Sequence, residues 1–195
     1  MTPKVVSFLA SGQGTNFSAA AEKIKSGYIK ARLGILVSDN DAPALRKAES
    51  FGMKSFLVNP KDYSSKQDYE DEMIRLFREH KSSLIVAAGY MRILSPRFVR
   101  AFQNRIINVH PSLLPAFPGR EAQRQALDYG VKVTGCTTHF IDEGTDTGPI
   151  IMQSAIPLLQ SDNIASISKK IRAEEHKILS ESIKLFCEDR LKIIN

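Results

Sequence analysis

The sequence predicts an α/β fold in which a mostly parallel, twisted sheet carries helices on both faces. Over roughly the first 110 residues, short apolar runs alternate with segments of helical periodicity, a pattern typical of Rossmann-like folds with fully buried parallel strands. After residue 130, two strand-like runs follow one another directly and indicate an antiparallel pair. A long helix over about residues 163–187 is predicted to close the chain.

The predicted elements alternate regularly along the chain. The parallel strands are apolar runs over 5–10, 33–37, 84–88 and 106–109. Two of the intervening helices are predicted over 16–27 and 43–51. A further helix is indicated by apolar and aromatic residues that share one helical face: Tyr69, Met73, Leu76, Phe77 and His80. The antiparallel strands are predicted over 131–141 and 149–156, on either side of an acidic, glycine-rich segment.

Length and composition predict one globular domain with an ordinary core. The chain has 195 residues, of which 43% are hydrophobic and 25% charged. No apolar run is long enough to cross a bilayer, and Cys136 and Cys187 form no metal or disulfide pattern, which favours a reduced, cytoplasmic setting. The net charge of +6 suits nucleic acid or small polyanions. Because the basic residues are spread along the chain, small anionic substrates are favoured.

The glycine-rich segment SGQGTN follows the first predicted strand and opens the first predicted helix. Its glycines allow close approach of a ligand, and free N–H groups at a helix start attract phosphate. The alternative is a structural turn in which Thr15 or Asn16 caps the helix. Phe17 occupies the third glycine position of a dinucleotide fingerprint, so the segment predicts a single phosphate rather than a dinucleotide.

Asn108 and His110 follow the apolar run that starts at residue 106. Residues two apart in an extended segment point the same way, and ligands of open α/β sheets bind beyond the carboxyl ends of strands. An amide and an imidazole together can stabilise an oxyanion during acyl transfer. Three nearby prolines, at 111, 115 and 118, would stiffen the loop. The alternative is an ordinary turn with a packed histidine.

Two carboxylates are further candidates for the site. Asp146 lies in the acidic loop between the antiparallel strands, where it could orient His110, or simply belong to a solvated turn. The loop lacks the spacing of a calcium site. In the long C-terminal helix, the apolar stripe passes through Glu174 and Glu175. A carboxylate on such a stripe needs a partner, either a cation of the protein or the amine of a ligand.

Four segments together, SGQGTN, AGYMRILSP, INVHPSLLPAFPG and HFIDEGTDTGPIIMQ, resemble the folate-dependent formyltransferase family, and within it the enzymes that act on phosphoribosylglycinamide. The likeness covers essentially the whole chain. It implies one formyltransferase domain over 1–195, with a phosphate-binding lobe over about 1–100 and a folate and catalytic lobe over about 101–195. Family members that act on methionyl-tRNA or that deformylate folate carry extra domains, and the chain length separates this sequence from them.

The resemblance implies roles for residues that match the family's motifs. Asn108, His110 and Asp146 match the catalytic trio. The glycinamide substrate would meet the phosphate-binding turn and one helical acid: Gly14, Thr15, Asn16 and Glu175. The folate would be held by residues around the segment 91–94: Lys66, Met91, Arg92, Ile93, Leu94, Asn108 and Ile141. Lys66 stands where arginine is expected, and Glu121 where histidine is common.

The implied reaction transfers a formyl group from 10-formyltetrahydrofolate to phosphoribosylglycinamide in purine biosynthesis. The resemblance implies no metal, no nucleic-acid or membrane partner, and a cytoplasmic monomer or homodimer. One alternative is a deformylase that gives the formyl group to water. An alternative of another class is a basic nucleic-acid-binding domain, which would offer no reason for the Asn108–His110 pair or for Glu175.

Overall fold

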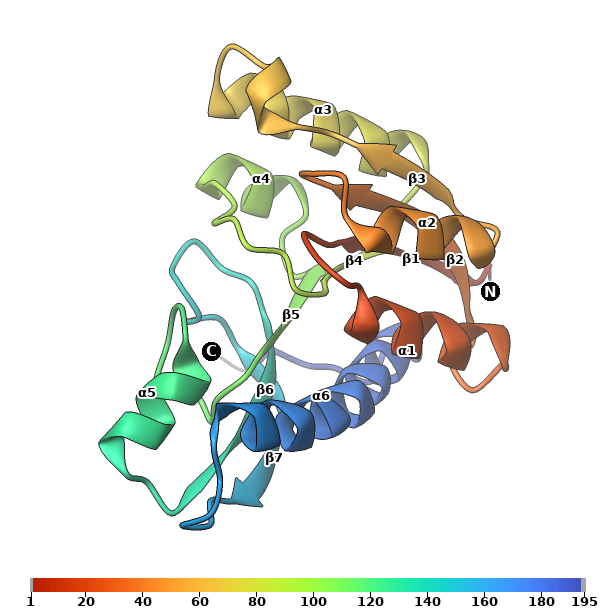
Figure 1. Ribbon diagram of the computed structural model, residues 1–195. Helices are drawn as coiled ribbons and strands as arrows, with labels where there is room; N and C mark the ends of the chain where they lie inside the picture. Colours follow the sequence, from red (N-terminus) through yellow and green to blue (C-terminus); the bar gives the residue numbers. More distant parts are fainter. Residues whose placement is uncertain (1, 194–195) are drawn as a thin grey trace.

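A computed structural model describes residues 2–193, which are organised around a single seven-stranded sheet (Figure 1). The strand order is β3-β2-β1-β4-β5-β6-β7. The strands are β1 (Lys4–Leu9), β2 (Ala31–Ser38), β3 (Lys54–Leu57), β4 (Leu84–Ala87), β5 (Ile106–His110), β6 (Val133–Phe140) and β7 (Ile150–Pro157). The first five strands pair in parallel, and β6 and β7 are antiparallel. The predicted fold class is confirmed.

Residues 2–193 also form six α-helices and one short 3-10 helix, all of which lie between strands except the last helix, which follows β7. They are α1 (Thr15–Lys25), α2 (Pro43–Ser50), η1 (Pro60–Asp62), α3 (Lys66–Glu79), α4 (Pro96–Ala101), α5 (Ala122–Tyr129) and α6 (Ile164–Cys187). The predicted long helix corresponds to α6. The sequence did not reveal β3, α4 or α5, because β3 is a four-residue edge strand without a fully buried position and the two helices are short.

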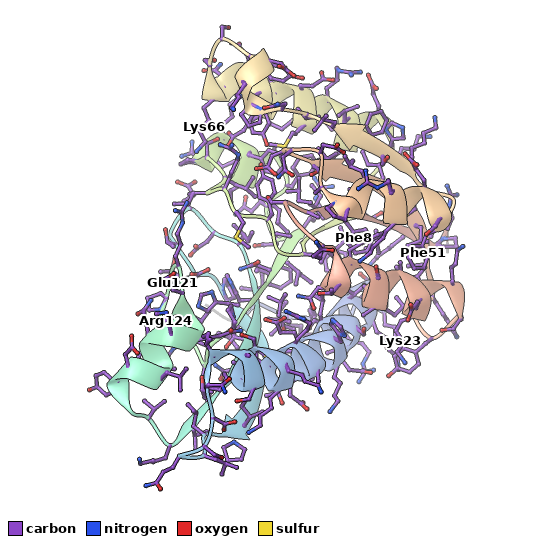
Figure 2. The ribbon with its side chains drawn as sticks, viewed as in Figure 1. Phe8, Lys23, Phe51, Lys66, Glu121 and Arg124 are labelled. Carbon is purple, nitrogen blue, oxygen red and sulfur yellow. The ribbon has the colours of Figure 1, made fainter. Side chains whose placement is uncertain are left out.

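Each face of the sheet has its own core. On one face α1, α2 and α6 cover the strands, and Phe17 of α1 packs edge-on against Phe8 and Phe51. Figure 2 labels Phe8 and Phe51 on this side of the sheet. On the other face α3 and α4 bury a second cluster that contains Phe77 and Phe98. The predicted coverage of both faces is therefore confirmed.

The side chains of β5 are divided between these two cores. Ile107 and Val109 belong to the core beneath α1 and α6, whereas Ile106 belongs to the core beneath α3 and α4. Because side chains alternate along a strand, Asn108 and His110 project on the same face as Ile106. They lie toward the carboxyl end of β5, which pairs with β4, and the sheet order changes direction between β1 and β4. Ligands of open α/β sheets bind beyond the carboxyl ends of the strands near such a point.

Candidate active site

The turn between β1 and α1 is built around Gly14. This residue has a φ of 66° and forms the N-cap of α1 without a side-chain cap. A Cβ atom here would lie 2.9 Å from the Cβ of Ala44, so a larger residue would be both strained and crowded. Since neither Thr15 nor Asn16 caps the helix, the capping interpretation is wrong. The first N–H groups of α1 are left for an anion.

Asn16 in the first turn of α1 contacts Glu175 of α6. The Asn16 Nδ2 atom donates to Glu175 Oε2 over 3.1 Å. Glu175 is only 9% exposed, and this burial raises the pKa of its carboxyl group. Its hydrogen-bond partner is a neutral amide, whereas the neighbouring Glu174 pairs with Lys177. The buried Asn16 Oδ1 atom has no hydrogen-bond partner among the described residues, so this pair includes one acceptor for which these residues supply no donor.

His110, the last residue of β5, lies close to Asp146 of the acidic loop. The His110 Nδ1 atom lies 3.4 Å from Asp146 Oδ2, and its Nε2 atom lies 2.9 Å from the carbonyl oxygen of Phe117. Because a carbonyl only accepts, Nε2 carries hydrogen. Asp146 Oδ2 also accepts a hydrogen bond of 2.8 Å from the backbone N–H of Gly119. The loop that follows β5 therefore holds both the imidazole and the carboxylate.

A second histidine, which the sequence analysis missed, joins this cluster. His139 of β6 is 1% exposed, and its Nε2 atom lies 3.2 Å from Asn108 Nδ2 and 3.7 Å from Asp146 Oδ1. Burial lowers the pKa of its imidazole. Only the antiparallel register, in which Asn108 faces His139, reveals the contact. The available signal in the sequence was the position of His139 near the end of the predicted strand that leads into the acidic loop.

The segment 91–94 lies between the turn after β1 and the start of α3. The Met91 N–H donates to Ser11 Oγ over 3.0 Å, and Arg92 Nε donates to Asp39 Oδ2 over 2.7 Å. Lys66 Nζ donates to the carbonyl of Ile93 over 2.9 Å. The side chains of Met91 and Ile93 are 68% and 66% exposed. The segment thus presents two apolar side chains from a backbone that is fixed by hydrogen bonds.

Leu94 and Ile141 contribute differently to this region. Leu94 is buried in the core beneath α3 and α4, and Ile141 packs against the same core. The Ile141 N–H donates to the carbonyl of Ile106 over 2.9 Å, which ties the start of the acidic loop to β5. The candidate folate residues therefore surround one end of the sheet, but only some of them expose side chains.

Sequence comparison assigns the chain to a family. Residues 4–183 match the family model described as formyl transferase. The chain belongs to the formyl transferase family. It is 43% identical, over 182 residues, to the phosphoribosylglycinamide formyltransferase of Bacillus subtilis (strain 168), and the match covers 93% of each chain.

Solved structures of the formyl transferase family have the same fold. Glycinamide ribonucleotide transformylase 1 from Symbiobacterium toebii superposes with a TM-score of 0.96 at 43% identity, covering 98% of this chain and 91% of that one. A formyltetrahydrofolate deformylase from Pseudomonas syringae pv. tomato str. DC3000 superposes with a TM-score of 0.93 at 28% identity. That match covers all of this chain but 64% of the deformylase.

The acidic loop of this formyl transferase is strongly ordered by its own side chains. Asp142 Oδ1 accepts hydrogen bonds from the Gly144 N–H (3.0 Å) and from Thr147 Oγ1 (2.8 Å). Glu143 accepts from Arg100 Nε over 2.6 Å. A Cβ atom at Gly148 would lie 1.9 Å from the carbonyl oxygen of Phe140, so the loop can pack this closely only with glycine there. The solvated-turn interpretation is therefore incomplete, since these contacts fix the backbone that carries Asp146.

Lys66 and Glu121, which the sequence analysis expects to depart from the family pattern, lie on the surface (Figure 2). Lys66 at the start of α3 reaches Ile93 and lies 3.8 Å from Glu70 Oε1. Glu121 is exposed and forms the N-cap of α5 with a φ of 57°. Lysine keeps the positive charge at residue 66 but loses the bidentate geometry of arginine.

Residues 2–193 show neither a metal-binding cluster nor a membrane-spanning helix. In this range no three His, Cys, Asp or Glu side chains gather as a metal site requires. No helix of the same range combines the length and the apolar character needed to cross a bilayer.

Proposed function

We propose that this chain transfers the formyl group of 10-formyltetrahydrofolate to the amine of 5'-phosphoribosylglycinamide, in the synthesis of purines. The proposal depends above all on the convergence of Asn108, His110 and Asp146 at the end of β5. It is supported by the likeness to phosphoribosylglycinamide formyltransferases along nearly the full chain.

The phosphate of the acceptor would bind at Gly14, Thr15 and Asn16. The uncapped start of α1 offers backbone N–H groups, and the open space around Gly12 allows close approach. Glu175 would receive the glycinamide amine. Burial raises the pKa of Glu175 and so makes its carboxylate a stronger base. An amine attacks only when it is neutral, and the Glu175 carboxylate would accept a hydrogen bond from the N–H of this neutral amine.

The folate would lie against the segment 91–94, with its formyl group toward Asn108. Met91 and Ile93 offer exposed apolar side chains to a flat ring system, and Lys66 offers a positive charge at the edge of the site. These features fit a pteridine with an anionic tail. The proposed pocket is formed by residues of one chain, while the state in solution, monomer or homodimer, stays a prediction.

The amine would attack the formyl carbon directly, without a covalent enzyme intermediate. The Asn108 Nδ2 group and the His110 imidazole would stabilise the oxyanion that develops. A protonated His110 would hold its second hydrogen on Nδ1, beside Asp146. It would pass this hydrogen to the folate nitrogen as the bond between that nitrogen and the formyl carbon breaks, and would regain a proton from the attacking nitrogen. Asp146 would stabilise the charged ring and orient it.

A formyl-transfer assay with both substrates tests this proposal. Removal of one oxyanion donor costs on the order of 100- to 1,000-fold in rate, and we expect at least this loss in kcat for Asn108→Ala and for His110→Ala. If both variants are folded and turn over at near wild-type rates, the assignment of these residues is wrong.

The deformylase alternative rests on the shared fold of the Pseudomonas syringae pv. tomato enzyme. A measurement of formate release from 10-formyltetrahydrofolate separates the two activities. We expect little formate in the absence of phosphoribosylglycinamide and rapid formyl transfer in its presence. Formate release that is fast and independent of the acceptor would instead identify a hydrolase.

A further inference from the structure

His139 and Asn108 are directly opposed across the only junction between parallel and antiparallel pairing in the described sheet. Asn108 is the register partner of His139, and directly opposite side chains of two antiparallel strands share a face and touch. The Asn108 Nδ2 atom lies 3.2 Å from His139 Nε2. His139 is therefore in contact with one of the two groups proposed to stabilise the oxyanion, although it lies behind that group and is itself 1% exposed.

The other nitrogen of His139 identifies which atom of the ring carries hydrogen. The Nδ1 atom lies 2.9 Å from the carbonyl oxygen of Phe140. A carbonyl oxygen only accepts, so Nδ1 donates this hydrogen bond. In a neutral ring Nε2 is then without hydrogen and presents a lone pair to Asn108. Burial lowers the pKa of His139 and favours this neutral form.

The charged neighbours of His139 offset only part of the lowering of its pKa by burial. Asp146 and Asp142 favour the protonated ring, and His110 opposes it. The Nε2 atom lies 3.7 Å from Asp146 Oδ1, which is too far for a hydrogen bond. Asn108 is therefore the hydrogen-bond partner of Nε2, and the carboxylate stays available to His110.

An acceptor at Nε2 determines which way the Asn108 amide faces. Only the NH2 end of the amide can donate to a lone pair, so the amide oxygen must lie on the other side. One N–H is used by His139, and the second N–H remains for the reacting carbonyl. A side chain that is fixed in this way loses little entropy when it binds the transition state.

We propose that His139 is a positioning residue, which acts through Asn108 as a neutral imidazole with its hydrogen on Nδ1. This inference rests on the proposed function in one respect, which is that Asn108 stabilises the oxyanion. His139 itself touches neither the substrate nor the reacting atoms.

Two substitutions of His139 separate an acceptor function from simple packing. In His139→Gln the side-chain amide reaches the position of Nε2 and offers an acceptor oxygen to Asn108. In His139→Asn the shorter amide keeps a donor near Phe140 but leaves Asn108 without its acceptor. We expect kcat to fall on the order of 10-fold in His139→Asn, the effect of about one lost hydrogen bond, and His139→Gln to restore most of it. The KM values of both substrates should stay within about twofold of wild type, because ground-state binding is unchanged.

A double-mutant comparison tests whether His139 acts through Asn108. In an Asn108→Ala background, His139→Asn should change kcat by less than about twofold, because the coupled interaction is already lost. A full additional 10-fold loss would overturn the inference, as would equal losses in His139→Gln and His139→Asn. Wild-type activity in the Asn108→Ala variant alone would instead contradict the proposed function. This result differs from those that would overturn the role of His139, so the two failures can be told apart.

The protonation of the ring can be measured independently of activity. Long-range proton–nitrogen NMR spectra of wild-type protein labelled with 15N-histidine distinguish the two tautomers and the imidazolium. We expect hydrogen on Nδ1 alone at about pH 7. A ring with hydrogen on Nε2, alone or together with Nδ1, would contradict the inference even if the variants fail to fold.

Discussion

Replacing Asp146 with asparagine removes a negative charge beside His110 while it keeps the shape of the side chain. The distance of 3.4 Å between His110 Nδ1 and Asp146 Oδ2 corresponds to an attraction of about 5 kcal/mol for a protonated ring, at an effective dielectric constant of about 20. The side chain of Asp146 is only 13% exposed, so water replaces a small part of this attraction. A loss of about 4 kcal/mol in the transition state lowers kcat by about 1,000-fold.

The assay is steady-state formyl transfer under saturation with both substrates. In Asp146→Asn the side-chain carbonyl can still accept from the Gly119 N–H, as the Asp146 carboxylate does over 2.8 Å, so we expect the loop to stay folded. Asp128→Asn is the control, because it removes the same charge from an exposed position of α5. If folded Asp146→Asn protein keeps kcat within about tenfold of the control, the electrostatic reasoning is refuted.

Three further substitutions test other parts of the molecule. Glu175→Gln should raise the KM for phosphoribosylglycinamide about tenfold, the effect of one charged hydrogen bond. Burial raises the pKa of Glu175, so its ionisation destabilises the native state as pH rises through the native pKa. The glutamine variant should therefore have a higher Tm than wild type at pH 8, and this difference should disappear below the ordinary carboxyl pKa. A Tm difference that is independent of pH would contradict ionisation of Glu175 as its cause. Gly14→Ala should lose about 1–3 kcal/mol of unfolding free energy in urea, from its positive φ and its contact with Ala44. Gly12→Ala is the matched control because a Cβ atom there meets nothing within 4 Å, and equal losses in both variants would exclude the steric explanation. Phe77→Ala should lose about 3–5 kcal/mol by the same measurement, since Phe77 packs edge-on against Phe98 and Phe102 with ring centroids 6.2 and 6.0 Å apart; a loss below about 1 kcal/mol would mean that this core collapses around the cavity.

The sequence predicted the central strands well because they are buried on both faces. β1 and β4 are almost wholly apolar, and β5 is apolar except for Asn108 and His110, which mark the edge of the sheet where the site lies. By contrast, β3 lies at the edge of the sheet, with exposed residues at both ends and two half-buried residues between them, so its composition resembles that of a loop. Continuous burial along β1, β4 and β5 therefore gives these strands the clearest signal in the sequence.

The site was predictable where its residues are neighbours in the chain. Asn108 and His110 share a face because they are two residues apart in a strand, which spacing alone shows. The partners that complete the site are distant: Asn16 and Glu175 are 159 positions apart, and the contact between Asn108 and His139 depends on strand register. The sequence could say that a carboxylate on the α6 stripe needs a partner, but not that the partner is an asparagine of α1.

The reversal of strand direction between β5 and β6 has a consequence for how this chain can be altered. Asn108 and His139 meet only in the observed register, and a slip of one residue would turn His139 toward α6 and bring Thr138 or Phe140 opposite the amide. Length changes should therefore be tolerated in surface connections such as residues 158–163, whereas even one inserted residue within β5 or β6 should abolish turnover in a protein that still folds. In this molecule the register of β5 against β6 determines which side chains meet at the site.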